Sequence, residues 1–434
     1  MSTSGNSTPG RYEWIRISET KDRFLRGGKP FFYLADTAWM AFSNLTLEDW
    51  EEYLFFRQAQ GFNALQIVVM PVTHDTSEDA STMYPFRVGR GGAFDFCAID
   101  ERYFEKAVRM VGMARERGFI PVLAPLWVNW IPGTWASAKS PRTAMSFEAA
   151  REYLARTLPL FAPYQPIFLA SGDTRFESDE VRYYRMVLEQ VRMHCPGCLT
   201  TLHRSPGADL PEELMRSPDL DFYMYQSGHH IESQDNAYRL AEAFLAKPVK
   251  RPIVNGEPCY DGSGYGFRYG RFGRFEVRRA SWQSLLSGAK AGLGYGAHGV
   301  WSWHRRGARF TSVPFSGQPF DWRTAMRLGG AADASFARTL FERYELFDLE
   351  PAGLIRNASP EIRMAMSPDS RKFAIYVPYP VEVEVGMDLL GYALEVVDLD
   401  ARSFGSSAVE PGADVSRIAM HGANTDVLIL GTKS

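Results

Sequence analysis

The chain of 434 residues has no dominant charge sign and no long hydrophobic run. Its 48 Lys and Arg residues and 51 Asp and Glu residues give a formal net charge of −3, which offers no electrostatic basis for binding nucleic acid or an anionic membrane. No stretch approaches the ~18–20 apolar residues of a membrane-spanning helix. The first residues also lack the basic and apolar segments of a secretory signal. We therefore expect no nucleic-acid or membrane partner and a cytoplasmic location, with secretion as the alternative if a signal peptide has been removed.

Cysteine is also scarce. The four residues Cys97, Cys195, Cys198 and Cys259 are too few for a disulfide scaffold in a chain of this length. Cys195 and Cys198 have the spacing of a redox motif or of half a zinc site, but no second pair follows them. This makes the pair a weak signal for metal or redox chemistry. We therefore expect no metal and no cofactor.

From residue 31 onward, short apolar runs alternate with helical patterns. Eight strand–helix units over roughly 300 residues are typical of a (β/α)8 TIM barrel, an α/β fold of about 250 residues or more. A doubly wound open sheet is the alternative, but it usually carries a glycine-rich phosphate loop after its first strand. Asp36–Trp39 stands at that place here, so the barrel is favoured. The expected strands lie at residues 31–35, 63–70, 119–126, 166–170, 199–202, 222–225, 252–255 and 294–303.

The pattern changes after about residue 350, where short strands follow one another without helices. Residues 381–385, for example, alternate strictly between valine and glutamate. Such a series of short strands predicts a small antiparallel β-sandwich. The expected domains are a flexible N-terminal tail (1–20), a barrel (21–345) and a C-terminal β-sandwich as an accessory domain (350–434).

The polar and aromatic residues that follow the eight strands form the candidate site. In a barrel, the carboxyl ends of the strands and the loops after them line the active site. These positions carry no lysine, which argues against Schiff-base chemistry. The candidate site residues are Asp36, Thr37, Trp39, Trp127, Asp173, Thr174, His203, Tyr225, Gln226, Ser227, His229, Glu257, Tyr260, His298, Trp301 and Trp303.

Two carboxylates in this set indicate a reaction. Asp173 follows the fourth strand and Glu257 the seventh, and these strands lie nearly opposite each other in an eight-stranded barrel. Cleavage of a glycosidic bond needs one carboxyl group to protonate the leaving oxygen and another to stabilise or attack the anomeric carbon. We expect Asp173 to be the acid/base, with a raised pKa, and Glu257 to be the nucleophile, kept ionised by hydrogen bonds. A single carboxylate at a strand end is more often a helix cap or a loop ion pair, but two among Trp, Tyr and His favour catalysis.

The remaining candidates are expected to bind substrate. Asp36 is a third carboxylate, whose expected role is a hydrogen bond to a sugar hydroxyl, with helix capping and catalysis as alternatives. His203 and His229 are explained equally well as structural residues and as ligand-binding residues. Aromatic residues make up 14% of the chain, and at least one ring at a strand end should stack on the apolar face of a sugar, although each is as well explained by the core. The candidate platforms are Trp39, Trp127, Trp301 and Trp303.

At these positions the sequence resembles the apiosidase-like enzymes of glycoside hydrolase family 140. The resemblance implies a retaining hydrolase of clan-A type that releases apiose, a branched pentose in furanose form, from plant glycans or from apiosylated glycosides such as flavonoids. It assigns the same roles, with Asp173 as acid/base and Glu257 as nucleophile. The C-terminal segment is also similar to the small β-sandwich of these proteins. The segments that carry the resemblance are FFYLADTAW (31–39), GFNALQIVVM (61–70), LASGDT (169–174), QSGH (226–229), VNGEPCY (254–260) and GYGAHGVWSW (294–303).

The sequence departs from many clan-A barrels at the fourth strand. Those barrels carry Asn-Glu there, whereas this chain has Gly172-Asp173, with a shorter acid. That difference fits the apiosidase-like group better than galactosidase-like or cellulase-like barrels. Members of the group also look secreted, so a chain without a signal suggests an enzyme that acts on imported small glycosides.

Three other functions stay open at this point. Another retaining glycosidase, acting on arabinofuranosyl or galactosyl residues, fits the same residues. A non-catalytic carbohydrate-binding barrel would not need both Asp173 and Glu257. A metal-dependent amidohydrolase needs a His-x-His pair after the first strand, where this chain has Asp36-Thr37-Ala38.

Overall fold

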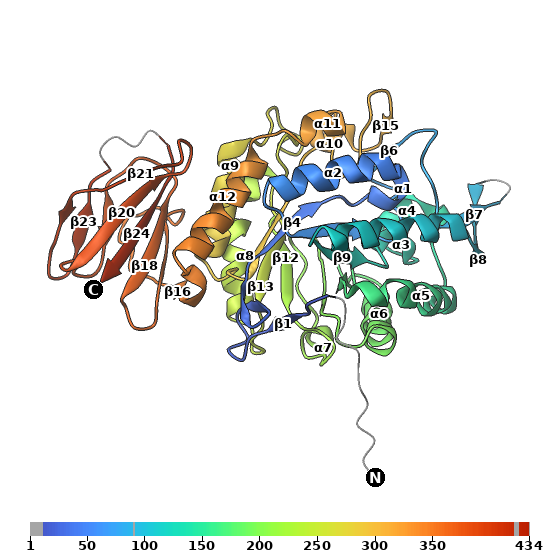
Figure 1. Cartoon of the computed structure of the whole chain (residues 1–434), viewed down its shortest axis with the longest axis horizontal. Coiled ribbons are helices and arrows are strands. Elements are labelled where there is room, and N and C mark those ends of the chain that lie inside the picture. The colour runs from blue at the N-terminus through green and yellow to red at the C-terminus, as the bar shows by residue number, and fades with distance from the viewer. Residues whose placement is uncertain (1–11, 90–91, 421–424, 434) are drawn as a thin grey trace, which may run out of the picture.

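The computed structural model describes residues 12–89, 92–420 and 425–433, which form a barrel with a smaller β-domain beside it (Figure 1). The eight barrel strands lie side by side in the order of the chain, and the paired neighbours are parallel. The predicted (β/α)8 barrel is thereby confirmed. The strands are β4 (Tyr33–Thr37), β5 (Ala64–Val68), β9 (Ile120–Ala124), β10 (Ile167–Leu169), β11 (Thr200–Thr201), β12 (Tyr223–Gln226), β13 (Ile253–Glu257) and β14 (Gly292–Tyr295).

Hydrogen bonds between β11 and the start of β12 close the ring. The backbone N–H groups of Asp221 and Phe222 donate to Thr200 O at 3.1 and 3.4 Å. Thr201 Oγ1 donates to Phe222 O at 2.7 Å. Every residue of β4, β5, β9 and β13 is buried, because the barrel interior covers one face of each strand and helices cover the other. This explains why the strands appear in the sequence as nearly continuous apolar runs.

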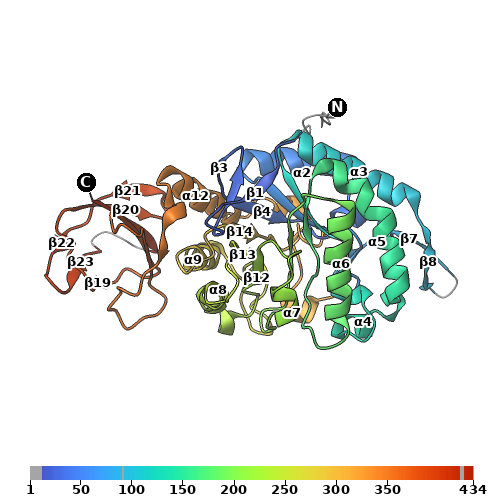
Figure 2. The same cartoon turned by 90° about the horizontal axis from the view of Figure 1, so that it is seen from below.

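Helices surround the ring of strands, as the view from below shows (Figure 2). The first long helix begins where Thr46 Oγ1 accepts a hydrogen bond from Asp49 N–H at 3.1 Å, which satisfies one of the free N–H groups of the first turn. The main helices are α2 (Leu47–Ala59), α3 (Glu101–Glu116), α5 (Phe147–Phe161), α6 (Glu180–His194), α8 (Asn236–Leu245), α9 (Arg274–Leu285) and α12 (Gly330–Arg343).

A three-stranded antiparallel sheet precedes the barrel. It consists of β1 (Ile15–Ile17), β2 (Phe24–Arg26) and β3 (Lys29–Phe31). Phe24 is fully buried and packs edge-on against Phe222, with ring centroids 5.0 Å apart. The prediction of a flexible tail over residues 1–20 is therefore wrong for β1, which pairs with β2 and buries Ile15. Residues 1–11 lie outside the described residues.

The C-terminal region forms two antiparallel sheets, as the sequence predicts. One contains β16 and β17, then β18, β24, β20 and β21; the other contains β19, β23 and β22. Their facing side chains form a separate apolar core that includes Ile375, Val385, Ile418 and Ile429. The strands are β16 (Glu350–Pro351), β17 (Arg363–Met366), β18 (Lys372–Val377), β19 (Val383–Val385), β20 (Tyr392–Asp398), β21 (Ser403–Gly405), β22 (Val409–Glu410), β23 (Ser416–Ile418) and β24 (Val427–Lys433).

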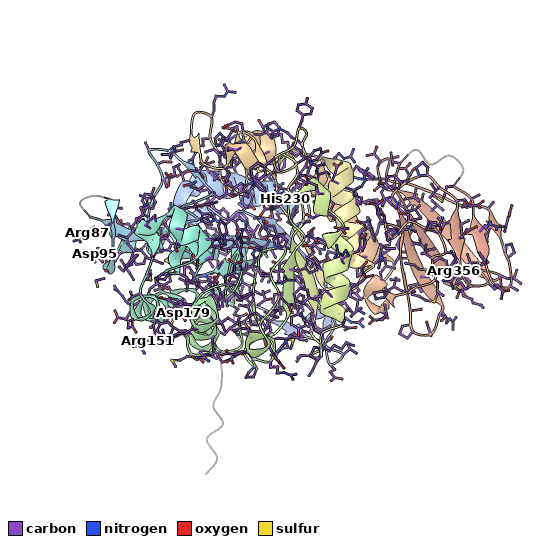
Figure 3. All side chains as sticks on the ribbon, turned by 180° about the vertical axis from the view of Figure 1, so that it is seen from behind. Arg87, Asp95, Arg151, Asp179, His230 and Arg356 are labelled. Atoms are coloured by element: carbon purple, nitrogen blue, oxygen red, sulfur yellow. The ribbon has the colours of Figure 1, made fainter. Side chains whose placement is uncertain are left out.

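The C-terminal sandwich packs beside α9 and α12 of the barrel (Figure 1). Arg278 of α9 crosses this interface, where its guanidinium donates to Asp426 at 2.8 Å and to Asp400 at 3.0 Å. Figure 3 shows from behind that Arg356 lies on the sandwich, well away from His230 on the barrel. Among the described residues, no helix has the length and apolar character needed to cross a membrane.

Candidate active site

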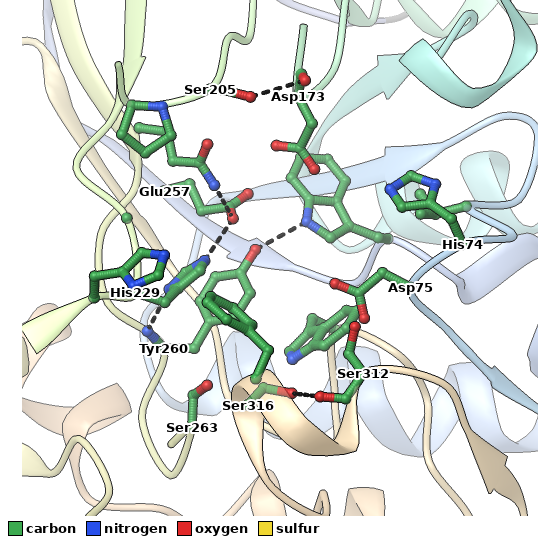
Figure 4. A pocket seen from close by; sticks show the side chains of 18 of the residues that line it. His74, Asp75, Asp173, Ser205, His229, Glu257, Tyr260, Ser263, Ser312 and Ser316 are labelled. Atoms are coloured by element: carbon green, nitrogen blue, oxygen red, sulfur yellow. Dashed lines mark hydrogen bonds and ion pairs between the residues drawn. The ribbon is translucent and has the colours of Figure 1, made fainter. Parts of the chain in front are cut away.

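A cavity of about 400 Å³ opens at the carboxyl ends of the barrel strands (Figure 4). Its walls combine carboxylates, histidines and aromatic rings from several different loops. This is the place where a barrel of this kind carries its active site. The sequence-predicted residues that line it are Trp39, Trp127, Asp173, Gln226, His229, Glu257, Tyr260 and Trp301.

Asp173 reaches the cavity because the chain turns sharply after β10. Its φ of 49° is a left-handed conformation, which aspartate tolerates better than most residues. Gly172 lies so close to Trp127 that a Cβ there would come within 1.8 Å of the indole, so only glycine fits. Ser205 Oγ and Trp135 Nε1 donate to Asp173 O at 2.9 and 3.2 Å. These contacts fix the backbone while the side chain, 27% exposed, faces the cavity.

A β-bulge directs Glu257 into the same cavity. Tyr225 pairs with Asn255 but Gln226 pairs with Glu257, so Gly256 is the extra residue in β13. A side chain at Gly256 would bring its Cβ within 2.4 Å of the Met224 sulfur. The extra residue reverses the alternation of side chains at the end of the strand. The side chain of Glu257, the last residue of β13, therefore points inward and lines the cavity, with 4% of its surface exposed.

Nitrogen donors surround the Glu257 carboxylate. Gln226 Nε2 donates to Oε1 at 2.5 Å, and His229 Nε2 lies 2.8 Å from the same oxygen. His203 Nε2 lies 3.2 Å from Oε2. The Nδ1 atom of His203 accepts from the backbone N–H of Asp173 at 3.4 Å, so Nε2 carries the proton that faces Glu257. Both oxygens thus contact groups that favour the charged carboxylate.

The two carboxyl groups have opposite electrostatic environments. Burial and the negative charge of Glu257 raise the pKa of Asp173 to about 7. Burial also acts to raise the pKa of Glu257, but the imidazoles of His203 and His229 hold it well below its usual range. One oxygen of Asp173 and one of Glu257 lie within 4.8 Å of each other. Near neutral pH the site therefore offers a carboxyl group that can bind and release a proton next to one that stays ionised.

Aromatic rings form the wall next to these carboxylates. Trp39 Nε1 donates to Tyr260 OH at 2.9 Å, and the rings of Trp39 and Trp127 lie 4.9 Å apart. Tyr260 also packs against His229 at 4.2 Å and against Trp301 at 5.9 Å between ring centroids. The backbone N–H of Tyr260 donates to His229 Nδ1 at 3.3 Å, which leaves Nε2–H of His229 to donate to Glu257. The wall thus encloses the cavity and also orients the His229 ring toward Glu257.

Asp36 does not reach the cavity, so the prediction that it binds a sugar hydroxyl is wrong. Its side chain points out of the barrel onto α2 and is fully buried. There Asp36 Oδ2 accepts from Arg57 Nε and from Tyr53 OH, each at 2.6 Å. The carboxylate is part of a buried ion pair between a strand and a helix.

Seven further candidates lie behind the cavity wall rather than in it, which corrects their predicted contact with substrate. Thr174 Oγ1 donates to Glu180 at the start of α6 at 2.8 Å. His298 is fully buried and accepts from Trp301 Nε1 at 3.1 Å, and Trp303 is a core residue only 1% exposed. His203 differs from the others because it contacts Asp173 and Glu257 from behind. The seven residues are Thr37, Thr174, His203, Tyr225, Ser227, His298 and Trp303.

Several cavity residues lie on loops outside the set predicted from the sequence. His74 and Asp75 follow β5, Trp135 follows β9, and Ser312 and Phe315 follow β14. His74 and Asp75 come shortly after the second apolar run and so carry the same strand-end signal as Asp173. Ser312 and Phe315 lie more than fifteen residues beyond the end of β14, so their position in the sequence does not mark them as strand-end residues.

Three residues of this site lie close enough together to hold a metal ion. Asp173, His203 and Glu257 each offer one ligand atom, and these atoms lie within 4.8 Å of one another. His203, however, has its Nδ1 occupied by a backbone N–H and its Nε2 protonated toward Glu257, whereas a metal ligand needs a free lone pair. The residues therefore suit an ion pair better than a metal centre, and the absence of a metal or cofactor stays a prediction.

Comparison with known proteins identifies a matching family and solved structures of the same fold. The sequence model of the apiosidase-like catalytic domain matches residues 19–348. No curated protein matches the chain. A solved glycoside hydrolase superposes with a TM-score of 0.79 at 16% identity, covering 97% of both chains. A glycoside hydrolase family 5 protein from Bacteroides vulgatus superposes with a TM-score of 0.79 at 18% identity, covering 97% of this chain and 93% of that one.

The structural matches share the fold over 97% of this chain, and the family match spans the whole barrel that holds the cavity. The chain belongs to the apiosidase-like family and is a glycoside hydrolase.

Proposed function

We propose that the protein is a retaining glycosidase in which Glu257 is the nucleophile and Asp173 the acid/base. The observation that carries the proposal is the separation of their oxygens, within 4.8 Å. Retaining enzymes hold their two carboxyl groups about 5–5.5 Å apart, whereas inverting enzymes leave about 6.5–9.5 Å for a water molecule. The opposite pKa shifts of Asp173 and Glu257 support the same division of roles.

The charge of Glu257 links the two steps of the reaction. Asp173 protonates the leaving oxygen while Glu257 Oε attacks the anomeric carbon, which forms a glycosyl ester and releases the alcohol. Ester formation removes the negative charge that raises the pKa of Asp173. Asp173 then stays ionised and accepts a proton from the water that hydrolyses the ester. The same carboxyl group thus serves as acid in the first step and as base in the second.

We propose that the sugar released is apiose, from plant glycans or apiosylated glycosides such as flavonoids. Membership of the apiosidase-like family supports this substrate. The cavity of about 400 Å³ is large enough for one furanose ring and part of its leaving group. Its Trp39, Trp127 and Trp301 rings offer apolar faces of the kind that stack on sugars.

A panel of nitrophenyl glycosides tests the proposal directly. We expect the β-apiofuranoside to be hydrolysed fastest, and apiosylated flavonoids to release free apiose. Faster hydrolysis of an arabinofuranoside or a galactoside would keep the retaining mechanism and change the sugar. Dialysis against a chelator should leave the rate unchanged, since carboxylates carry every step. Loss of activity that zinc restores would overturn the mechanism and point to Asp173, His203 and Glu257 as metal ligands.

A further inference from the structure

A third carboxylate, Asp75, faces the cavity and has no part in the two steps above. It lies on the loop after β5 and lines the cavity together with His74 and Ser312. Figure 4 shows it on the side of the cavity opposite Glu257 and His229. Among the described residues, no hydrogen-bond donor reaches its Oδ1 atom, and none reaches His74 Nδ1. Two adjacent residues of the active-site wall thus each carry a buried polar atom without a partner among the described residues.

The loop that carries Asp75 is fixed rather than free-standing. Next to it, β6 (Ser77–Glu78) pairs with β15 (Arg309–Phe310), which belongs to the loop after β14. Thr76 N–H donates to Thr311 Oγ1 at 2.8 Å, and Thr311 N–H donates to Thr76 O at 3.1 Å. The ring of His74 packs edge-on against Trp135 at 4.8 Å. Asp75 is thus held in one place relative to the catalytic carboxylates.

Neighbouring groups act in both directions on the charge of Asp75. Burial and the negative charge of Glu257 raise the pKa of Asp75, whereas the hydroxyl of Ser312 and the charges of His229 and Lys139 act in the opposite direction. A partly buried carboxylate with spare acceptor capacity needs donors, and a sugar supplies them as hydroxyl groups. A carboxylate can accept from two neighbouring hydroxyls at once, one on each oxygen. A side chain of this kind suits two adjacent sugar hydroxyls.

We propose that Asp75, supported by His74 and Ser312, is a specificity-determining residue that accepts hydrogen bonds from vicinal hydroxyls of the sugar attacked by Glu257. The inference rests on the proposed glycosidase function and deepens it. It names the substrate class as glycosides whose glycone presents two adjacent free hydroxyls away from the anomeric carbon. A glycone with one of those hydroxyls removed or blocked should be a poor substrate.

The test pairs an isosteric substitution in the protein with a deletion in the substrate. Asp75→Asn keeps the shape but converts one acceptor oxygen into an NH₂ donor. On the best glycoside of the panel, we expect kcat/KM to fall about 10- to 100-fold, the range for loss of a hydrogen bond to a charged group. On the deoxy analogue that lacks the recognised hydroxyl, Asp75→Asn and wild type should differ by less than a factor of about three. Equal losses on every analogue, or no loss on the parent, would overturn the proposal.

A control variant and a binding assay separate this inference from the proposed function. Glu78→Gln changes an acidic residue of the same loop that does not line the cavity, and its kcat/KM should match wild type. If wild type hydrolyses no glycoside, calorimetric titration with free apiose, arabinose and galactose replaces the kinetic assay. Binding by wild type that Asp75→Asn loses would support the inference and reject the hydrolase mechanism. Active wild type with an unaffected Asp75→Asn variant would reject the inference alone, and neither hydrolysis nor binding would reject both.

Discussion

Asp36 near the end of β4 and Glu257 at the end of β13 are both buried carboxylates with nitrogen donors beside them, but only Glu257 faces the cavity. Asp36 points outward, where Arg57 and Tyr53 of α2 enclose it. Glu257 points inward because Gly256 inserts a bulge just before it. The first carboxylate joins a strand to a helix, whereas the second is available to a substrate.

The comparison shows that a place at a strand end does not by itself decide a role. Side chains alternate between the two faces of a strand, so a shift of one residue turns a cavity residue into one that faces the helices. An irregularity such as a bulge or a left-handed residue can restore the inward direction. Both catalytic candidates depend on one: the bulge before Glu257, and the left-handed backbone of Asp173.

The largest effect should follow from replacing Asp173. Asp173→Asn should lower kcat/KM about 10²- to 10⁴-fold on glycosides with poor leaving groups, because proton donation is lost, and far less on a dinitrophenyl glycoside. Wild-type activity should fall as the pH rises through about 7, where Asp173 loses the proton that it donates. The variant should lack this alkaline limb on the dinitrophenyl substrate. A pH–rate profile that keeps the limb in the variant would assign the titration to another group.

We expect Asp36, unlike Glu257, to contribute to stability and not to catalysis. Asp36→Asn leaves the charge of Arg57 buried without its partner, and breaking a buried ion pair in this way costs about 3–5 kcal/mol. Urea denaturation should show a loss of that size, while kcat of the folded variant stays within a few-fold of wild type. Asp173→Asn serves as the opposite control, with activity lost and stability kept. A stable Asp36→Asn variant without activity would return Asp36 to the active site.

Trp301 and Trp303 should also differ in role, one contributing to substrate binding and the other to stability, with smaller effects on activity than Asp173. Trp301 lines the cavity, whereas Trp303 stacks on Trp322 at 4.5 Å in the core. Trp301→Ala should raise KM about 3- to 10-fold with little change in kcat, since a platform contacts ground and transition states alike. Trp303→Ala should instead lower the free energy of unfolding by about 3–5 kcal/mol. Equal effects of the two substitutions on KM and on stability would contradict the division.

The sequence was sufficient to predict the barrel, the C-terminal sheets and eight residues of the cavity. The barrel follows from buried strands alternating with helices, a pattern that is local in the chain. The proximity of Asp75 and Ser312 in the cavity wall is harder to predict, because the pairing of β6 with β15 joins segments more than two hundred residues apart. The orientation of Asp36 depended on Arg57 and Tyr53, whose partnership no spacing rule reveals.

Glu257 should form a covalent bond to the sugar, and trapping that bond is the most direct test of its role as nucleophile. In Asp173→Asn, a dinitrophenyl glycoside should form the glycosyl ester rapidly, while the missing base slows its hydrolysis. Mass spectrometry of the intact protein should then show the added mass of one glycosyl residue, and peptide analysis should place it on Glu257. The Asp173→Asn/Glu257→Gln double variant should show no addition. An adduct on another residue, or an unmodified protein that releases a sugar of inverted configuration, would contradict the assignment of Glu257 as nucleophile.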